Sequence, residues 1–591
     1  MNVSRMARII HVMGTRYLRH HKPSETQILI ILSFVVGIST GLGAVLFIWL
    51  IEYAKQFFFG YSLSYLNQFI ISWKLWIPLI PMIGGAIVGP IVYKYAREAK
   101  GHGVPEVMEA VALRGGIIRP RVAIAKSFAS AICIGSGGSA GREGPIVQIG
   151  SAIGSIIGQI FRMSGQRVKI LVGCGAAAGI SAVFNAPIAG VIFALEIILG
   201  DFGVRTFSPV ILSSVIASVI SRSLLGDSPA FDIPREYALV SAYEIPIYIV
   251  LGAFTAVVGK GFSKALYFSE DLFEKIRMPG YMKPALGGLL LGIIGFFLPQ
   301  IFSDGYDTIG QALVGKVPLL LLGILVFAKI LATSLTLGSG NSGGIFAPSL
   351  FMGAVAGGFF GDLVHSLFPA VTATSGAYAV VGMAGVVAGA THAPITAILI
   401  IFEMTGDYQI ILPLMITCVF ATLISNRIDR ESIYTLKLSR RGVKLRSGRD
   451  IEILSSTKVW EVMHTDFQSV PHNTPFYRLL QIFEQAGDDY FPVVDQSGEL
   501  LGTISFQDLR SVITRTGLDT LVIAADICHT HPTRAYPNET LDDALKKIAA
   551  RDLPVIPVVE SEGGKKLVGL LKKGDIYSAY NRKVIDKLSR A

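Results

Sequence analysis

The stretch GSGGSAGREGP at residues 135–145 has a second copy, GSGNSGGIFAP, at residues 338–348. Six of the eleven aligned positions are identical. A further echo follows each copy, because FNAPIAGVIFALEI at 184–197 resembles THAPITAILIIFEM at 391–404, with a Glu nine residues after the Pro in both. Two echoes in the same order indicate two related halves, each with a glycine-rich break that leads into a helix.

The composition places these halves in a membrane. Only 16% of the 591 residues are charged and 51% are hydrophobic, whereas soluble proteins carry about 25% charged residues. Apolar stretches long enough to span a bilayer occur at 27–51, 76–93, 244–259, 285–302, 317–335 and 409–425. The remainder between 104 and 405 is interrupted by Gly and Pro, and such shortened pieces persist at membrane depth only when they are buried in protein or line a polar path. The pattern is typical of a transporter that binds a small charged solute near the middle of the bilayer.

The positive charge is concentrated at the two ends of the membrane region. The net charge is +10, and two runs contain basic residues and no acid: Arg5, Arg8, Arg16, Arg19 and Lys22 in the first, and Lys437, Arg440, Arg441, Lys444, Arg446 and Arg449 in the second. The positive-inside rule therefore predicts a multi-pass protein of the plasma (inner) membrane with both termini in the cytoplasm. Runs this short beside a membrane do not indicate a nucleic-acid partner, and the first apolar run is too long for a signal peptide.

The character of the sequence changes near residue 440. We predict a basic cytoplasmic segment at 1–24, a membrane transport domain at 25–438, a basic linker at 439–456, and two soluble α/β modules at 457–516 and 517–591. Each module repeats the order helix, strand, turn, strand, helix. The predicted elements are a helix at 475–486, strands at 490–495 and 500–505 and a helix from Gln507, then a helix at 541–550, strands at 556–559 and 567–571 and a helix from Gly574.

The four cysteines are scattered and mostly lie in apolar segments, at Cys133, Cys174, Cys418 and Cys528. Packing thiols are therefore expected rather than a disulfide or a metal site.

The glycine-rich breaks suit an anion. Moving an anion into hydrocarbon costs on the order of tens of kcal/mol in the bare Born picture. A lysine or arginine would offset this cost but hold the ion tightly, whereas the N–H groups at a helix N-terminus present only about half a unit of positive charge. Glycine exposes these N–H groups because the backbone can turn sharply without a Cβ. We therefore expect the loops at 135–145 and 338–348 to converge and to solvate an anion with peptide dipoles.

Three motifs carry a resemblance to a known family. GHGVP at 101–105, GREGP at 141–145 and GIFAP at 344–348 resemble the signature loops of the CLC chloride channels and transporters. The resemblance runs from about residue 30 to 437. It implies an all-α polytopic membrane domain of the CLC type, an inverted repeat with broken helices, and a homodimer with one anion pathway per subunit. The two α/β modules resemble a pair of CBS domains, a frequent C-terminal attachment in that family.

The resemblance also assigns the anion site. The N–H groups of Ile345 and Phe346 would bind the central anion, Gly144 would lie beside it, and Tyr434 would add its hydroxyl. An aromatic anchor at the membrane interface is the alternative for Tyr434. His102 stands where chloride-preferring relatives usually carry Ser. Its imidazole would touch the anion with a dependence on pH, or it would be a helix-end residue that contacts nothing.

Glu143 is the candidate gate and proton acceptor. A carboxylate at membrane depth marks a functional site by default. At a helix start, among N–H groups that attract anions, an ionised Glu143 can occupy the anion's own position, and protonation would release it. This resembles the external glutamate gate of the family. The alternative is a carboxylate that caps its helix beside Arg142.

Two further glutamates, Glu196 and Glu403, occupy equivalent places in the two echoes. This symmetry indicates shared structure, in which each accepts hydrogen bonds from exposed backbone near a broken helix. Coupled CLC proteins often have another glutamate immediately after the position of Glu196, but this chain has Ile197. Glu196 does not replace it, because neighbouring helical residues point about 100° apart. Two functions therefore stay open: an anion/proton antiporter whose protons use water for the inner part of the path, or a passive, voltage- or pH-gated anion channel.

The CBS pair predicts a cleft for an adenine nucleotide. Asp508 and Asp575 match positions that accept ribose hydroxyls, Ser505 matches a hydroxyl that contacts phosphate, and Lys572 offers a point charge instead. The same aspartates alternatively serve as helix caps, and the pair alternatively serves only for dimerisation. No other cofactor is expected.

Two other classes of membrane protein with CBS pairs do not fit the chain. A metalloprotease needs HExxH, which none of the ten histidines begins, and a magnesium transporter needs clustered intramembrane acids. We therefore expect neither an enzyme nor a metal site. Chloride, nitrate and other halides all remain candidates for the anion.

Overall fold

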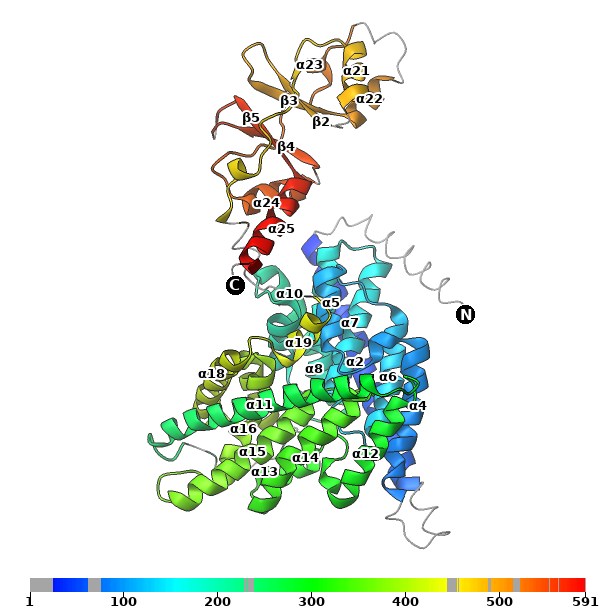
Figure 1. The fold of residues 1–591 in the computed structure, drawn as a ribbon, viewed down its shortest axis with the longest axis vertical. Coiled ribbons are helices and arrows are strands. Elements are labelled where there is room, and N and C mark those ends of the chain that lie inside the picture. The colour runs from blue at the N-terminus through cyan, green and yellow to red at the C-terminus, as the bar shows by residue number, and fades with distance from the viewer. Residues whose placement is uncertain are drawn as a thin grey trace. The chain divides into compact units, whose positions relative to one another are not determined.

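The computed structural model describes residues 25–61, 76–227, 231, 237, 239–443, 454, 456–486, 490–513, 521–551, 553–561 and 563–589. The chain forms two compact units, Met1–Leu445 and Arg446–Ala591 (Figure 1). The predicted basic segment 1–24 and the linker residues 444–453 lie outside the described residues. The helix Ile433–Arg440 belongs wholly to the first unit.

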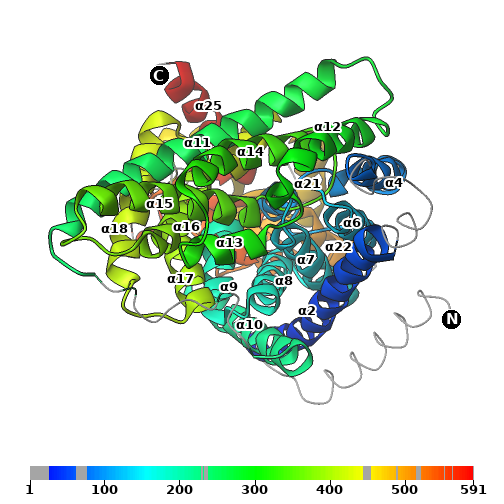
Figure 2. The same cartoon turned by 90° about the horizontal axis from the view of Figure 1, so that it is seen from below.

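The first unit consists of helices in two successive sets. The first set is α2 (Glu25–Lys55), α4 (Leu79–Tyr95), α5 (Val104–Leu113), α6 (Pro120–Gly135), α7 (Glu143–Ile160), α8 (Gly165–Phe184), α9 (Pro187–Phe193) with its π-helical continuation η4 (Ala194–Leu199), and α10 (Val204–Leu225). The second set is α11 (Glu244–Lys275), α12 (Lys283–Phe297), α13 (Tyr306–Leu313), α14 (Leu319–Gly338), α15 (Phe346–Leu367), α16 (Ser375–Thr391), α17 (Pro394–Thr405) and α18 (Ile411–Ile428), followed by α19 (Ile433–Arg440). The two sets lie side by side in Figure 2.

Seven helices of the described chain are long and apolar enough to cross a membrane. Each predicted apolar stretch coincides largely with one helix, but the sequence missed the spans formed by α8, α10 and α15. The reason is visible where α8 packs on α7. A Cβ on Gly175 would lie 1.9 Å from the carbonyl oxygen of Gly150, so the helices approach through small residues that lower the hydropathy of the sequence.

A pseudo-two-fold axis relates the two sets. Gly141 and Gly344, which occupy equivalent positions in the two glycine-rich stretches, exchange both hydrogen bonds, with N–H···O distances of 2.8 and 2.6 Å. Contacts that exchange in this way between equivalent positions define a two-fold relation. The prediction that the two loops converge is confirmed.

Side chains repeat this exchange. The hydroxyl of Ser130 lies 2.9 Å from that of Ser342, and the hydroxyl of Ser139 lies 3.0 Å from that of Thr333. In the repeat, Ser130 is equivalent to Thr333 and Ser139 is equivalent to Ser342. The two hydrogen-bonded pairs are therefore related to each other by the same pseudo-two-fold axis.

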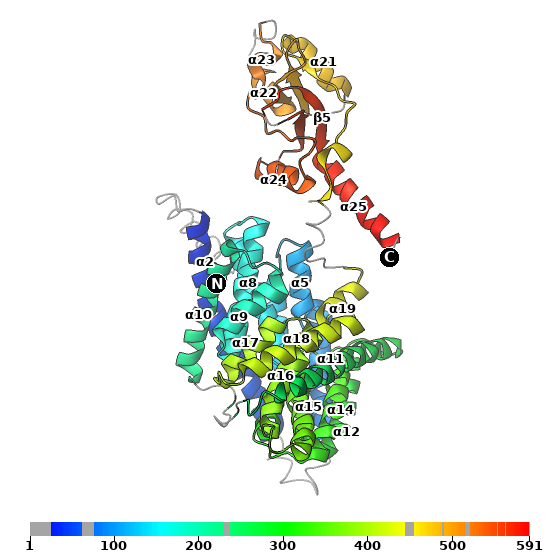
Figure 3. The ribbon, with the colours of Figure 1, turned by 90° about the vertical axis from the view of Figure 1, so that its left-hand side faces the viewer.

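The same symmetry governs the ends of α8 and α16. Asn185 and His392 each end their helix in the left-handed region at φ +58°. A proline then begins the next short helix in each set, where its missing N–H leaves no bond unmade. Figure 3 shows α8, α9 and α17 close together in the membrane unit.

The second unit contains the two predicted α/β modules. The first has β1 (Val470–Pro471), α21 (Phe476–Ala486), β2 (Tyr490–Val494), β3 (Leu500–Ser505) and α22 (Phe506–Ile513). The second has α24 (Leu541–Arg551), β4 (Val555–Val559), β5 (Leu567–Lys572) and α25 (Lys573–Ser589). The short helix α23 (Ala524–Ile527) lies between them in the sequence and packs in the core of the first. β1 is parallel to β2, whereas the pairs β2–β3 and β4–β5 are antiparallel. All eight predicted elements are confirmed, with boundaries that differ by at most one residue where the predicted end was given. The predicted boundary at 516/517 lies outside the described residues.

Candidate functional site

Three loops meet where the two glycine-rich stretches touch. Gly144, the second residue of α7, faces the loop before α5, and a Cβ on it would lie 2.1 Å from the carbonyl oxygen of His102 and 3.0 Å from Cα of Gly344. No side chain fits there, because both obstacles are backbone. The starts of α7 and α15 and the loop carrying His102 therefore form one junction, which brings together predicted residues that are far apart in the sequence.

Glu143 projects from the first turn of α7 toward the other half of the molecule. It is 1% exposed. Its Oε1 accepts a hydrogen bond from the Tyr306 hydroxyl at 3.1 Å, and its Oε2 accepts one from the N–H of Ala347, the second residue of α15, at 3.3 Å. The carboxylate thus occupies the place that an anion would take at the N-terminus of α15. It does more than cap its own helix.

Arg142, the neighbour of Glu143 in the sequence, is the N-cap residue of α7. Its guanidinium lies over the ring of Tyr306, 5.1 Å from the ring centroid. The tyrosine thus contacts both the gate candidate and the neighbouring cation, although nothing in the sequence pattern singled it out.

The predicted anion ligands Ile345 and Phe346 are each 2% exposed. Ile345 is the N-cap of α15 and Phe346 is its first residue. The first N–H groups of a helix have no acceptor within the helix, and the N–H groups of these two residues donate to no acceptor in the part of the chain that the structure describes. The N-terminus of α15 therefore presents buried donors next to the Glu143 carboxylate.

The rings of Tyr434 and His102 lie next to each other. Tyr434 is 2% exposed, so the alternative of an interfacial anchor is wrong. Its ring centroid lies 5.8 Å from that of His102. The imidazole Nε2 lies 3.3 Å from the hydroxyl of Tyr267, and therefore the alternative in which His102 contacts nothing is also wrong.

Two buried lysines at equivalent positions were missed by the sequence analysis. Lys126 on α6 donates to the carbonyl oxygens of Ala99 and Gly101 at 3.1 and 2.6 Å. Lys329 on α14 donates to those of Ile301 and Ser303 at 2.9 and 3.0 Å. Each ammonium group holds the loop that leads into a short helix, α5 or α13. The sequence could have indicated them, because Lys126 and Lys329 occupy equivalent positions in two apolar helices.

The glutamates Glu196 and Glu403 cap each other's repeat. Glu196 accepts hydrogen bonds from the N–H groups of Ile395 and Thr396 at 3.3 and 2.7 Å, and from the Thr396 hydroxyl at 2.6 Å. Glu403 accepts from the N–H groups of Ile188 and Ala189 at 3.0 and 2.7 Å. The predicted structural role is confirmed, and the exchange of partners between the halves is new.

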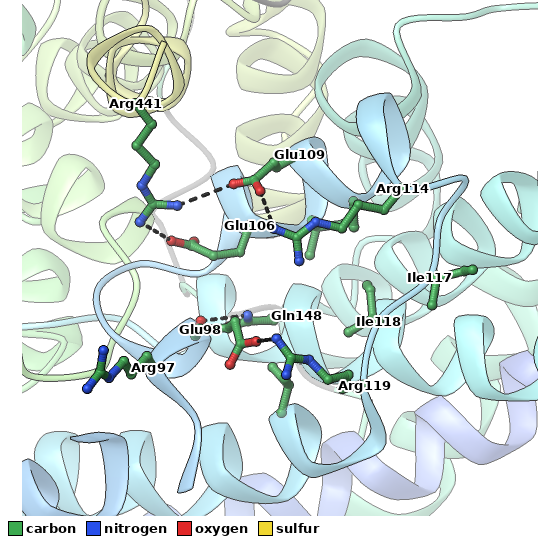
Figure 4. Close-up of a pocket in the computed structure, with 13 residues that line it drawn as sticks. Arg97, Glu98, Glu106, Glu109, Arg114, Ile117, Ile118, Arg119, Gln148 and Arg441 are labelled. Carbon is green, nitrogen blue, oxygen red and sulfur yellow. Dashed lines mark hydrogen bonds and ion pairs between the residues drawn. The ribbon is translucent and has the colours of Figure 1, made fainter. Parts of the chain in front are cut away.

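A cavity of about 380 Å³ lies beside α5, lined mainly by charged residues (Figure 4). Glu106 is its central carboxylate, paired with Lys437 at 2.9 Å and with Arg441 at 3.2 Å. Arg441 also reaches Glu109 at 3.4 Å. These contacts attach α5 to α19, the helix that carries Tyr434.

In the second unit the two predicted aspartates each meet a histidine. Asp508 lies 3.0 Å from Nε2 of His529, and Asp575 lies 3.0 Å from Nε2 of His464. Asp508 also accepts hydrogen bonds from the N–H and hydroxyl of Ser505 at 2.8 and 2.7 Å. Asp508 therefore caps the start of α22, as the alternative interpretation predicted.

Comparisons with known proteins agree with this architecture. The family model of the voltage gated chloride channel matches residues 84–426, and the CBS domain model matches 459–515 and 524–582. A putative chloride channel protein ClcB-like from Ralstonia nicotianae is 34% identical over 61% of this chain and 85% of its own. The H(+)/Cl(-) exchange transporter ClcA of Salmonella agona is 32% identical over 70% of this chain and 88% of its own.

Solved structures give the same result. A slow cyanobacterial Cl⁻/H⁺ antiporter matches with a TM-score of 0.63 and 28% identity over 70% of this chain and 97% of its own. A CLC-type fluoride/proton antiporter matches with a TM-score of 0.59 and 25% identity over 70% and 98%. A eukaryotic CLC transporter, at 21% identity, covers 93% of this chain and 97% of its own with a TM-score of 0.64, which extends the likeness in fold beyond the membrane unit. The chain therefore belongs to the CLC family, with the CLC-type inverted repeat of broken helices followed by a pair of CBS domains.

Proposed function

We propose that this protein exchanges chloride or a similar small anion for protons across a membrane, with Glu143 as gate and proton acceptor. One observation carries the proposal: the Glu143 carboxylate accepts a hydrogen bond from the N–H of Ala347 at the start of α15. The N–H groups of Ile345 and Phe346 beside it have no acceptor among the described residues. A group that holds an anion's position while ionised competes with that anion.

Protonation would end the competition. A hydrogen bond to a charged group is worth about 1.5–3 kcal/mol, and a neutral carboxyl loses most of that attraction to the helix N-terminus. The side chain then leaves the position to an anion and carries its proton with it. One residue thus ties the movement of the anion to the movement of H⁺, as the names of the ClcA relative and the cyanobacterial neighbour state for those proteins.

The test is flux in proteoliposomes with chloride, nitrate and fluoride in turn while internal pH is monitored. A chloride gradient should drive protons uphill in the unchanged protein. E143A should still pass anions but no longer move protons, because the competing carboxylate is gone. E52A, which changes an exposed glutamate of α2, should match the unchanged protein.

Two outcomes decide between the alternatives. Loss of anion flux in folded E143A would refute the assignment of the gate. Anion flux without uphill proton movement in the unchanged protein would favour the passive channel, for which the specific observation is the buried Ile197 in place of an inner glutamate.

We further propose a homodimer in the plasma (inner) membrane with both termini in the cytoplasm. The helices α9, α10, α17 and α18 lie along one side of the membrane unit (Figure 2). They expose apolar side chains there: Ile188, Val215, Val219, Ile395, Met415 and Val419. A second copy would cover part of this face, and a mass of two chains in detergent would support the proposal, whereas a mass of one would contradict it.

The CBS pair would bind an adenine nucleotide through Ser505, Asp508, Asp575 and Lys572. The family model supports a CBS pair, and both aspartates have polar partners that a ribose could replace. Calorimetric titration with ATP tests the assignment, which fails if D508A and D575A bind ATP as tightly as the unchanged protein.

A further inference from the structure

The hydrogen bonds around His102 determine where its ring carries a proton. The Tyr267 hydroxyl has a single hydrogen, which it donates to the carbonyl oxygen of Ile433 at 2.6 Å. Its oxygen must therefore accept from Nε2 of His102, 3.3 Å away. Since a neutral imidazole has one N–H and one bare nitrogen, Nδ1 of His102 is left with a lone pair.

The Nδ1 atom of His102 is an unpaired polar atom. It is buried, and it has no hydrogen-bond partner within the described ranges. Leaving a buried polar atom unpaired costs about 1–3 kcal/mol. A lone pair also repels an anion, whereas an N–H at the same place would attract one. A proton on Nδ1 and an anion beside it would therefore satisfy each other.

His102 is also part of the wall of the proposed anion site. Its carbonyl oxygen abuts Gly144 at the start of α7, and its ring lies against that of Tyr434. Tyr434 directly follows Ile433, whose carbonyl anchors the hydroxyl that fixes the imidazole. The titratable ring and the anion ligands are thus held by the same contacts.

The charges facing His102 make its protonation depend on an anion. They are Glu106 on α5, Lys126 on α6, Lys437 on α19 and Arg441 directly after it, with the neutral hydroxyls of Tyr267 and Tyr434 alongside. The burial of the ring disfavours a positive charge on it, and the excess of basic groups over the one carboxylate adds to this effect. A bound anion would offset this excess, so an occupied site favours a proton on Nδ1 and an empty site does not.

The cavity beside α5 offers the proton a route (Figure 4). Glu106, in the first turn of α5, follows His102 by four residues, lines the cavity, and has a buried Oε2 without a hydrogen-bond partner in the described chain. Arg114 and Arg119, whose side chains are more than half exposed, form its rim. Water in this cavity would bring a proton to the Glu106 carboxylate, which lines it.

We propose that His102 is a proton-linked anion ligand, whose Nδ1 takes up H⁺ from the α5 cavity when an anion occupies the junction of α7, α15 and Tyr434. The proposal rests on the proposed function, since it requires an anion to bind there. It would supply the inner proton-binding group that Ile197 cannot provide. The specificity of the site would then follow from the imidazole, which donates to an anion only while it is charged.

The test is calorimetric titration of the full chain with chloride in the E143Q background, which removes the gate's own proton. Titrations in buffers of different ionisation enthalpy give the number of protons taken up per chloride. We expect a measurable fraction of one proton, lost in E143Q/H102S and E143Q/H102N. E143Q/H392N is the matched control, because it replaces another, partly buried histidine with the residue that the first repeat carries at the equivalent place, and it should retain the uptake.

The affinity in the parent E143Q protein gives a second measurement that needs no His102 variant. With one linked proton, the chloride Kd should rise by up to about tenfold per pH unit on the alkaline side and level off in acid. Y267F, which removes the acceptor of Nε2–H, should shift the midpoint of this curve.

Four outcomes would overturn the inference: proton uptake that persists in both His102 variants, chloride binding without proton uptake in E143Q, a Kd that does not change with pH, or an unshifted midpoint in Y267F. If E143Q binds no chloride at all, the proposed function fails instead.

Discussion

At the scale of single residues, the junction is built from backbone groups that only small residues allow to meet. The resemblance of the three signature motifs to the family implied roles for Glu143, Gly144, Ile345 and Phe346 before the fold was known. It did not identify Tyr306 or Tyr267. Those hydroxyls come from other helices, and a contact between distant helices leaves no local pattern in the sequence.

Gly144 gives the sharpest prediction at this scale. G144A should abolish anion flux or prevent folding, because its Cβ would lie 2.1 Å from the His102 carbonyl oxygen and neither backbone segment is free to move. Flux and thermal unfolding in detergent measure both effects. G261A is the control: a Cβ there meets nothing within 4 Å, and alanine is the better helix former by about 1 kcal/mol. Equal behaviour of the two variants would contradict the close approach.

Tyr434 supports a second prediction. Y434A should weaken central anion binding at least about tenfold, the lower end of what a hydrogen bond to a charged group contributes. Y434F separates the hydroxyl from the ring and should lose most of the same affinity. Calorimetry with chloride is the measurement, and an unchanged affinity in both variants would remove Tyr434 from the site.

At the scale of elements, each repeat supplies a glutamate that caps a helix of the other repeat. The echo of Ala-Pro-Ile and Glu predicted that Glu196 and Glu403 would bind exposed backbone, and this is what they do. The similarity of the two repeats could not reveal that each glutamate binds the backbone of the other repeat. An alignment of the repeats shows which residues are equivalent, but not which residues are in contact. The sequence analysis missed the spans α8 and α15 for a related reason. Their glycines allow close contact with a neighbouring helix, and the sequence does not show which helix that is.

The crosswise capping predicts an unequal effect of two conservative changes. E196Q and E403Q should each lower the free energy of unfolding by about 1–3 kcal/mol, since each weakens hydrogen bonds to a charged acceptor. E196Q should be the more damaging, because Glu196 accepts three hydrogen bonds and Glu403 two. Thermal unfolding in detergent, with E52Q as control, measures the order. A larger loss in E403Q would contradict it.

At the scale of the whole molecule, the chain combines a membrane unit with a CBS pair that carries its own titratable contacts. The elements of the CBS pair were predictable because alternating apolar strands and short turns are local signals. The histidines that meet the aspartates were not. His464 and His529 come from segments outside the strand and helix pattern, and only the folded pair brings them to Asp575 and Asp508.

These contacts predict how nucleotide binding should respond to a change of the histidines. Each histidine occupies an aspartate that would hold ribose, at an Nε2–carboxylate distance of 3.0 Å. Replacing both histidines with alanine should therefore tighten ATP binding, by up to about fivefold for each contact of about 1 kcal/mol. H531A, which changes a nearby exposed histidine, should leave the affinity unchanged. Calorimetric titration with ATP is the measurement, and weaker binding in the double variant would contradict the prediction.

The exchange of glutamates between the repeats also bears on ancestry. A polypeptide that contained only one of the two repeats would carry a carboxylate without amides to donate to it, and amides without a carboxylate to accept from them. Two identical copies of such a polypeptide would supply each other's missing partner. Gene duplication and fusion of such a self-associating half would leave the arrangement seen at Glu196 and Glu403, in which neither portion is structurally complete alone.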